Sequence, residues 1–126
     1  MPSLNRVEII GRLGKDPEAR STPKGTQFAV FSVAVDRKWK SKSGEARQET
    51  DWFNVEAWGK TGEVCLKYLA KGRLVYIEGG LRTTRYEHEG ETRYFTKVVV
   101  QRMLMLDSAK EVPALEIAES PEEEAE

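Results

Sequence analysis

Apolar and polar residues alternate most clearly in a stretch near the middle of the chain. Because successive side chains on a β-strand point to opposite faces, the alternation puts Phe53, Val55 and Ala57 on one face, which we expect to be core. The other face is mostly polar, yet it carries two indoles, Trp52 and Trp58. One partly exposed indole is common in proteins. Two on the polar face of one strand suggest a surface that stacks flat rings.

Four further strands are predicted from the remaining apolar segments. Residues 6–13 alternate until Gly11, which predicts a bulge or a sharp bend there. Residues 26–35 are apolar on both faces, as expected of a central strand that is buried on both sides. Residues 74–86 and 92–106 predict two strands joined by a hairpin turn.

A short helix is predicted between the third and fourth strands. Thr61 has the side chain of an N-cap, and Glu63 follows in the first turn, where the helix dipole favours an acid. Val64 and Tyr68 supply an apolar stripe, and Gly72 is placed as the C′ glycine that ends the helix. The predicted order is therefore three strands, a helix and two strands.

The segments that link the first three strands show no apolar period. Residues 14–25 contain Pro17 and Pro23 and predict a turn-rich link. Residues 36–48 are polar and strongly basic, which predicts a flexible connection that carries Trp39.

Charge is distributed unevenly along the chain, although the net charge is only −1. Residues 1–110 hold all 20 Lys and Arg but only 14 of the 21 Asp and Glu, whereas residues 111–126 hold seven acids and no base. A basic body with an acidic tail is typical of nucleic-acid-binding chains. Because residues 108–126 also lack aromatic residues, we predict one domain over residues 1–107 and a disordered acidic tail over residues 108–126.

The sequence gives no support for a membrane protein or a secreted one. No segment approaches the roughly 20 apolar residues of a membrane span. The N-terminus lacks the apolar core of a signal peptide. The single Cys excludes an internal disulfide and fits a reducing compartment. We therefore expect a soluble cytoplasmic protein.

Catalytic and metal-binding motifs are also missing from the pattern. With one Cys and one His, no Cys/His zinc motif can be assembled. Cys65, between apolar neighbours, is expected to be a small core residue. Gly59-Lys60-Thr61 lacks the first glycine of a phosphate-binding loop, since Asn54 occupies that position. We predict no metal, no cofactor and no enzymatic activity.

The aromatic and basic residues carry the remaining functional signal. Trp39 lies in the basic connection, and Tyr86 follows Arg82 and Arg85 near a hairpin turn. Every nucleobase has a π face, so aromatic platforms bind single strands with little sequence preference, at about 1–3 kcal/mol per stacked base. Cations along the same groove add phosphate neutralisation. We therefore predict a surface that binds single-stranded nucleic acid.

Several segments of the chain match a known family in order. They are residues 4–7, 11–18, 49–53, 58–60, 68–72, 75–79 and 81–83. Through them the chain resembles the bacterial single-stranded DNA-binding protein family, over roughly residues 3–107. Members of this family are themselves the usual example of base stacking on aromatic platforms, so the stacking chemistry and the resemblance are not independent indications.

The resemblance implies a fold, an activity and a set of binding residues. The fold is all-β: a five-stranded OB-fold barrel with its short helix between strands three and four. The activity is coating and protection of single-stranded DNA, without sequence preference, during replication, recombination and repair. The implied base-stacking residues are Trp39, Trp52, Trp58 and Tyr86. The implied contacts to the DNA backbone are Arg6, Arg20, Lys38, Lys60, Lys71, Arg82 and Arg85.

The resemblance also implies partners. A homotetramer is expected, with the N-terminal strand around Val7, Glu8 and Ile9 pairing between subunits. Phe53 matches a position where the family often has His at a subunit contact, so an apolar contact would replace a polar one. Replication and repair proteins would bind the acidic tail.

The tail departs from the family pattern. The family's typical tail ends in an acidic tip of the Asp-Asp-Ile-Pro-Phe kind, whereas residues 121–126 hold the acids without the terminal aromatic residue. We expect the tail to compete with DNA for the basic body through its seven negative charges.

Two alternatives remain open from the sequence. A related OB-fold module with a narrower role, such as a primosome or plasmid accessory protein, would bind single strands weakly and form a dimer. A protein-interaction adaptor would present the same aromatic residues to a protein partner.

Overall fold

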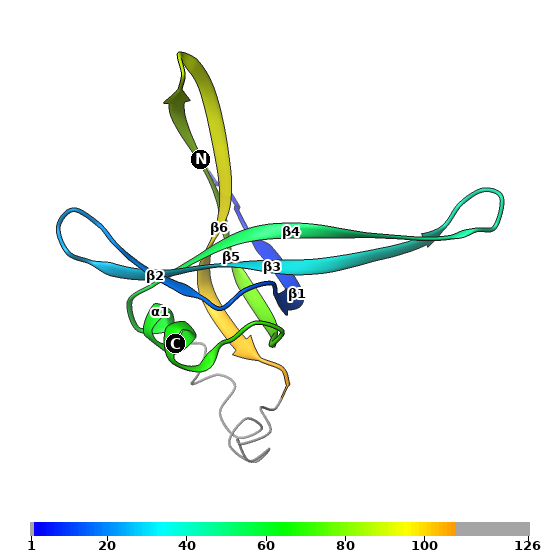
Figure 1. The fold of residues 1–126 in the computed structure, drawn as a ribbon, viewed down its shortest axis with the longest axis horizontal. Helices are drawn as coiled ribbons and strands as arrows, with labels where there is room; N and C mark the ends of the chain where they lie inside the picture. The colour runs from blue at the N-terminus through cyan, green and yellow to red at the C-terminus, as the bar shows by residue number, and fades with distance from the viewer. Residues whose placement is uncertain (1, 108–126) are drawn as a thin grey trace.

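The computed structural model describes residues 2–107, so the predicted acidic tail lies outside the described residues. Figure 1 shows the fold of this part. Its elements are β1 (Val7–Leu13), β2 (Glu18–Ser21), β3 (Gln27–Lys40), β4 (Ala46–Trp58), α1 (Gly59–Tyr68), β5 (Leu74–His88) and β6 (Glu91–Met105).

Five of the strands close into a barrel. β1 pairs with β5, β5 with β6 and β3 with β4, all antiparallel, whereas β4 and β6 pair in parallel. The barrel closes where Arg12 pairs with Ala34 and Leu13 with Val33, joining β1 to β3. The short β2 adds to β3 at the edge of the sheet. The predicted five-stranded OB-fold barrel, with its helix after the third barrel strand, is confirmed.

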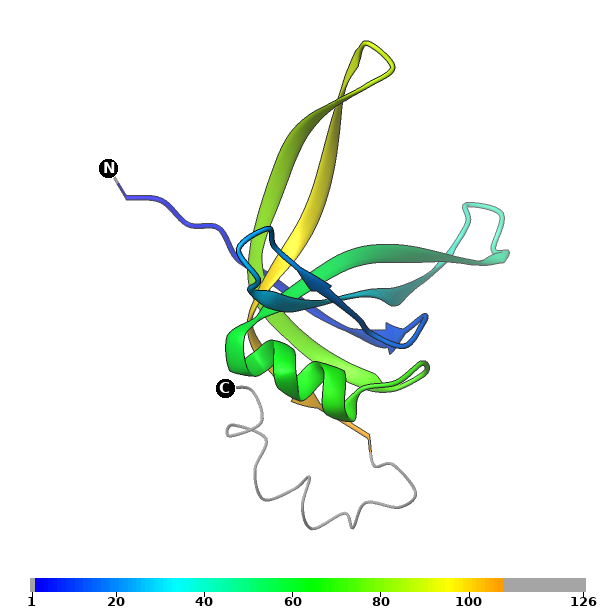
Figure 2. The same ribbon diagram turned by 60° about the vertical axis from the view of Figure 1, so that its left-hand side comes forward.

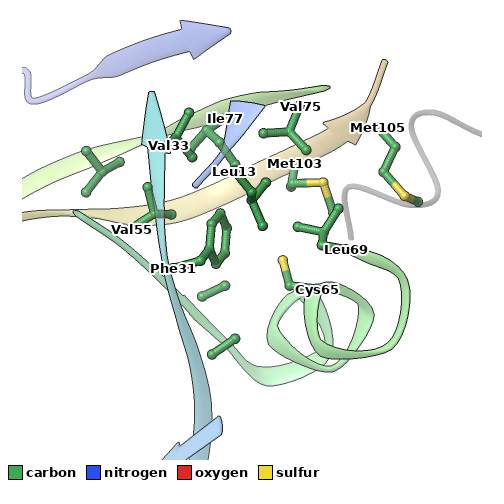
Figure 3. Close-up of a cluster of buried hydrophobic side chains, with 13 residues drawn as sticks. Leu13, Phe31, Val33, Val55, Cys65, Leu69, Val75, Ile77, Met103 and Met105 are labelled. Atoms are coloured by element: carbon green, nitrogen blue, oxygen red, sulfur yellow. The ribbon is translucent and has the colours of Figure 1, made fainter. Parts of the chain in front are cut away.

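The core is filled from alternate positions of the strands and from one side of the helix. Figure 3 shows Cys65 of α1 and Leu69, which directly follows the helix, pointing toward Leu13, Phe31 and Met103 of the barrel. Figure 2 shows α1 at the end of the barrel opposite the β5–β6 hairpin. The helix therefore plugs that end.

The core face predicted for the middle strand is confirmed. Val55 and Ala57 are buried, and Phe53 is partly buried and packs against the same cluster. Of the residues predicted to form the apolar stripe of the helix, Val64 is partly buried, but Tyr68 is exposed.

Two hairpins extend beyond the barrel in different directions (Figures 1 and 2). We call them the β3–β4 arm, residues 36–50, and the β5–β6 arm, residues 82–97. Both are continuous extensions of barrel strands, with uninterrupted pairing along the arm.

The prediction of a flexible connection over residues 36–48 is wrong. Apart from the turn at residues 41–45, this segment is paired strand. Cross-strand charge pairs stabilise it, since the Arg37 guanidinium lies 2.7 Å from the carboxylates of both Glu49 and Asp51. Residues 36–48 are polar because they form a solvent-exposed two-stranded ribbon. Such a ribbon has no buried face, so its sequence shows no apolar alternation from which a strand could be predicted.

The predicted link over residues 14–25 contains the additional strand β2. All four of its residues are exposed. It is placed by its backbone pairing with the first part of β3, and the sequence carries no apolar signal for it. Four strands therefore precede the helix, where three were predicted.

The helix begins earlier than predicted. Trp58, not Thr61, is the N-cap residue, and no side-chain hydrogen bond caps the helix. Thr61 and Gly62 are buried, and a Cβ on Gly62 would lie 2.5 Å from the carbonyl oxygen of Ala57. The start of α1 is thus set by close packing on the end of β4.

The helix also ends earlier than predicted. Gly72 is not its C′ residue but lies in the turn that follows, with φ of +90°. There it donates its backbone N–H to the carbonyl oxygen of Leu13 at 2.8 Å. This bond ties the turn after α1 to the end of β1.

Glycines occupy special positions in two strands of the barrel. In β5, the register with β6 shifts between Glu78 and Gly79. The predicted bulge at Gly11 is wrong, since β1 pairs with β5 without interruption through it. A Cβ on Gly11 would instead collide with the carbonyl oxygen of Ala34, so this glycine allows β1 and β3 to meet.

The substitution Gly11→Ala is expected to lower the free energy of unfolding by about 1–3 kcal/mol. The added methyl group would collide with the backbone of Ala34 and would lie 2.7 Å from Cγ1 of Val33. Gly80→Ala is the matched control, since its nearest neighbour, the carbonyl oxygen of Asn5, would lie 3.4 Å away. The control should change stability by less than about 0.5 kcal/mol. Urea denaturation measures both, and equal effects would contradict the role assigned to Gly11.

The buried thiol of Cys65 gives a prediction for alkaline pH. Cys65 is fully buried, and burial raises the pKa of its thiol from 9.0 to about 12. Between these values the folded chain keeps the proton that the unfolded chain loses, so stability present below pH 9.0 is lost as pH rises toward about 12. One proton contributes at most about 1.4 kcal/mol per pH unit. Urea denaturation measures the free energy of unfolding of the natural chain and of Cys65→Ala at each pH. Above pH 9.0 this free energy should fall with pH more steeply in the natural chain, by up to about 1.4 kcal/mol per pH unit. Equal pH dependence in the two chains would contradict the prediction.

Candidate nucleic-acid interface

The outward face of β4 carries both indoles, as the alternation predicted. Trp52 is 60% exposed, and a Cβ on Gly14 would collide with its ring, so the indole lies against the backbone after β1. Trp58 is partly buried because its ring stacks on Phe28, with centroids 4.1 Å apart and planes 15° apart. Phe28 is the cross-strand partner of Trp58.

Phe28 is a site residue that the sequence did not reveal. The prediction of a strand buried on both sides is wrong for β3. Its inward face, which includes Phe31 and Val33, is buried, while Phe28 and Ser32 on the other face are only partly buried. The apolar run therefore hid an aromatic residue that faces outward.

A buried carboxylate lies in the middle of this outward face. Glu56 is 8% exposed, and its Oε1 accepts a hydrogen bond from Nε1 of Trp58 at 2.7 Å. Its Oε2 lies 2.8 Å from Nζ of Lys97 on β6. Because a buried charge is costly unless it is paired, Glu56 and Lys97 stabilise each other and link β4 to β6.

Two open hollows lie next to each other on this face and share this ion pair. The first hollow, of about 370 Å³, is lined by Phe28 and Phe95 and by the cations Lys15 and Arg20. Glu56 and Lys97 line it as well.

The second hollow, of about 570 Å³, lies on the side of Trp58 and Arg82. Glu56 and Lys97 line this hollow too. The stacked pair of Phe28 and Trp58 therefore has one ring in each hollow.

The β5–β6 arm has two different faces. Residues directly opposite each other on antiparallel strands share a face. The pairs on one face are Arg82 with Lys97, Thr84 with Phe95, and Tyr86 with Arg93. The pair of Arg85 with Tyr94 lies on the other. The structure thus brings Arg82 and Tyr86 to the face of the hollows and places Arg85 away from it.

One surface therefore carries five partly exposed rings. We call it the stacking face, and it consists of Phe28, Trp52, Trp58, Tyr86 and Phe95. Tyr86 and Phe95 are 45% and 42% exposed. Like Phe28, Phe95 was not identified from the sequence. It directly follows Tyr94, and alternation alone does not show which of the two rings lies on this face.

Trp39 lies apart from the stacking face. It is 42% exposed and pairs with Arg47 on the β3–β4 arm, whereas Trp52 pairs with Ala34. Because the pairing between these positions is uninterrupted, Trp39 and Trp52 lie on opposite faces of the ribbon. Trp39 lies beside Arg37, whose Cζ is 5.4 Å from the ring centroid.

The predicted cations are distributed over several surfaces. Arg20 lines the first hollow, 3.2 Å from Glu18, and Lys38 lines a separate groove beside Trp39. Lys60 and Lys71 are exposed in the first turn of α1 and in the turn after it, and neither lines these hollows.

Arg6 precedes β1, away from the hollows. It lies 2.7 Å from Glu8 and 3.5 Å from Glu78. The charge of Glu78 raises the pKa of Arg6. Of the seven predicted cations, only Arg20 and Arg82 therefore line the hollows of the stacking face.

The residues predicted at subunit contacts have different exposures. Val7, Ile9 and Phe53 are partly buried and pack against the core of their own chain, while Glu8 is exposed. β1 pairs with β5 along one edge, but only its last two residues pair with β3 on the other. Within residues 2–107, the first half of β1 therefore has a free backbone edge.

The described part of the chain contains neither a metal cluster nor a membrane-spanning helix. Among residues 2–107, no group of three or more His, Cys, Asp and Glu side chains is placed to hold a metal ion. In the same range no helix has the length and apolar character that crossing a membrane requires.

Comparisons with known proteins agree with this fold. Single-stranded DNA-binding protein 1 of Chlorobaculum tepidum is 42% identical over 105 residues, which cover 82% of this chain and 65% of that protein. The match thus spans slightly less than two thirds of that relative's length.

Two solved structures superpose well on the chain. The Plasmodium falciparum SSB in complex with ssDNA has a TM-score of 0.79 and 28% identity, with 85% of this chain and 98% of that chain covered. A deletion mutant of the single-stranded DNA binding protein from Thermus aquaticus has a TM-score of 0.73 and 28% identity, with 83% and 51% covered. The model of the single-strand binding protein family matches residues 4–106, and the chain belongs to that family.

Proposed function

We propose that this chain binds single-stranded DNA with little sequence preference and coats it during replication, recombination and repair. The observation that carries the proposal is the stacking face, five rings set among cations on one side of the barrel. The Plasmodium falciparum neighbour, described in complex with ssDNA, supports the same class of ligand. Membership of the single-strand binding protein family supports the same class of ligand.

The proposed mechanism is stacking of bases combined with neutralisation of phosphates. An aromatic ring accepts any base face, at about 1–3 kcal/mol per base, and cations nearby release counterions from the strand. A duplex hides its base faces, so this surface selects single strands. Binding weakens as salt rises, because counterion release then gains less free energy.

The path of the strand follows from where the rings lie. Trp52 and Trp39 lie on opposite faces of the β3–β4 arm. A strand that stacks on both therefore passes around the arm, which favours a wrapped path over a straight one.

The proposed DNA-binding residues are those expected from the sequence together with two further aromatic residues. The proposed stacking residues are Trp39, Trp52, Trp58 and Tyr86, with Phe28 and Phe95 added from the structure. The proposed phosphate contacts are Arg6, Arg20, Lys38, Lys60, Lys71, Arg82 and Arg85. The domain that binds DNA is proposed to be residues 1–107, and the protein is proposed to act without catalysis in the bacterial cytoplasm, on the nucleoid.

Titration with oligo(dT) is expected to quench tryptophan emission, with an affinity that falls as salt rises. Trp52→Ala should weaken binding by about 1–3 kcal/mol, because the exposed ring on which a base stacks is lost. Tyr68→Ala is the matched control: Tyr68 is 49% exposed but lies on α1, away from the stacking face, and its loss should leave affinity unchanged.

Absence of quenching at low salt would contradict DNA binding. Affinity that survives Trp52→Ala combined with Trp58→Ala would favour the adaptor, whose aromatic residues meet a protein partner.

The free edge of β1 supports a second part of the proposal, a homotetramer in which this edge pairs between subunits. A strand edge with unpaired N–H and C=O groups is a ready template for a further strand. Glu8 lies on this edge and Phe53 occupies the second proposed contact.

The mass of the full chain in solution, measured without DNA, is expected to be that of four chains. With a long oligo(dT) added, the mass should rise without dissociation of the tetramer. A dimer that binds weakly would favour the narrower OB-fold module, and a monomer at every concentration would contradict pairing through β1.

A further inference from the structure

We propose that Glu56 is a positioning residue that makes the middle of the stacking face a site for bases and not for phosphates. It does so through two contacts, one to Trp58 and one to Lys97. The inference rests on the proposed function, and it specifies that the bases of the DNA strand, not its phosphates, lie over the middle of the stacking face.

The first contact fixes the indole. Trp58 is held by its Nε1–H bond to Glu56 at 2.7 Å and by its stack on Phe28 at 4.1 Å. A ring fixed in this way loses little side-chain entropy when a base stacks on it. Phe28 lines the first hollow and Trp58 the second, so the stacked pair is a wall with one ring toward each.

The second contact removes a cation from phosphate binding. Nζ of Lys97 lies 2.8 Å from Oε2 of Glu56, and the two side chains are only 24% and 10% exposed. The pair lines both hollows, so the centre of the surface carries no net charge. An unpaired carboxylate there would repel a phosphate, whereas the neutral pair beside two rings accepts a base.

The remaining cations lie around this neutral centre. Arg20 and Lys15 line the first hollow beside the carboxylates Asp16 and Glu18, and Arg82 lines the second. Among the described residues, Arg82 and Lys15 have no carboxylate within ion-pair distance, and Arg20 pairs with the exposed Glu18. The strand is therefore oriented with its bases over the Phe28–Trp58 wall and its phosphates toward these three residues.

The salt dependence of oligo(dT) binding by the full chain tests the charge part of the proposal. Each phosphate contact on a single strand contributes about 0.7 to the slope of log K against log salt concentration. Glu56→Gln keeps an oxygen that can accept the Trp58 N–H but frees Lys97 to contact phosphate, so the slope should become steeper by about 0.7.

Three controls bracket these values. Arg82→Met should make the slope shallower by about 0.7, which shows that the measurement detects one phosphate contact. Glu63→Gln removes an exposed carboxylate on α1 and should change nothing. The double variant Glu56→Gln/Lys97→Met should return to the natural slope.

The positioning of the indole is tested in a chain carrying Trp39→Phe and Trp52→Phe, in which Trp58 is the sole indole of the three. Glu56→Val in this background removes the hydrogen-bond acceptor and should reduce the quenching of Trp58 at saturating oligo(dT). Glu56→Gln should retain the quenching. A purely structural role for Glu56 would lower the unfolding temperature without moving the salt slope or separating these two variants.

An unchanged slope in Glu56→Gln, or a slope shallower than that of the natural chain in the double variant Glu56→Gln/Lys97→Met, would overturn the proposal. Each variant decides independently, so the second still tests the proposal where the first does not fold. If the natural chain fails to bind oligo(dT) at low salt, the proposed function falls. If the natural chain binds and Glu56→Gln has the same salt slope, only the role proposed for Glu56 is wrong.

Discussion

The barrel closes at one short contact, where the end of β1 reaches β3 and Gly11 leaves no side chain between them. β1 is already paired with β5 along its other edge, so this contact joins the two ends of one continuous sheet. A closed barrel fixes how much of each strand it uses. Strands β3 to β6 have 13–15 residues, more than the barrel takes up, and the surplus forms the two arms. The positions of Trp39 and Tyr86 are consequences of that closure.

Charge pairs stabilise two parts of the molecule in different ways. On the β3–β4 arm, Arg37 pairs with exposed carboxylates, and such pairs contribute about 0–1 kcal/mol each beside the backbone ladder. Between β4 and β6 the pair of Glu56 and Lys97 is largely buried, and losing one partner of a buried pair costs about 3–5 kcal/mol. The arm therefore tolerates substitution of its charges, whereas the centre of the stacking face does not.

The rings of the stacking face differ in how firmly they are held. Trp58 is fixed from behind by Phe28 and at its edge by Glu56, and Trp52 rests against the backbone at Gly14. Tyr86 lies on the β5–β6 arm, outside the barrel, and is 45% exposed. A single strand therefore meets preorganised rings over the barrel and a more adaptable ring on the β5–β6 arm.

The sequence determined the strands that bury an apolar face and the chemistry of the site. Alternation around Val55 identified the core face of β4, and the same alternation placed Trp52 and Trp58 outward, because a strand has only two faces. The sequence missed β2 and the β3–β4 arm, since solvated strands carry no apolar period and are placed by pairing alone. It also misplaced both ends of α1, which are set by packing on β4 and by the turn to β1.

Only the tertiary structure decided which residues share a surface. The register of β5 with β6 separates Arg82 from Arg85, three positions apart in sequence, by placing them on opposite faces. The parallel contact of β4 with β6 brings Glu56 to Lys97, 41 positions away, a pairing that no local pattern encodes. Composition and periodicity are local properties of the sequence. Strand register and barrel closure depend on the whole chain, and they determine which side chains come together in the site.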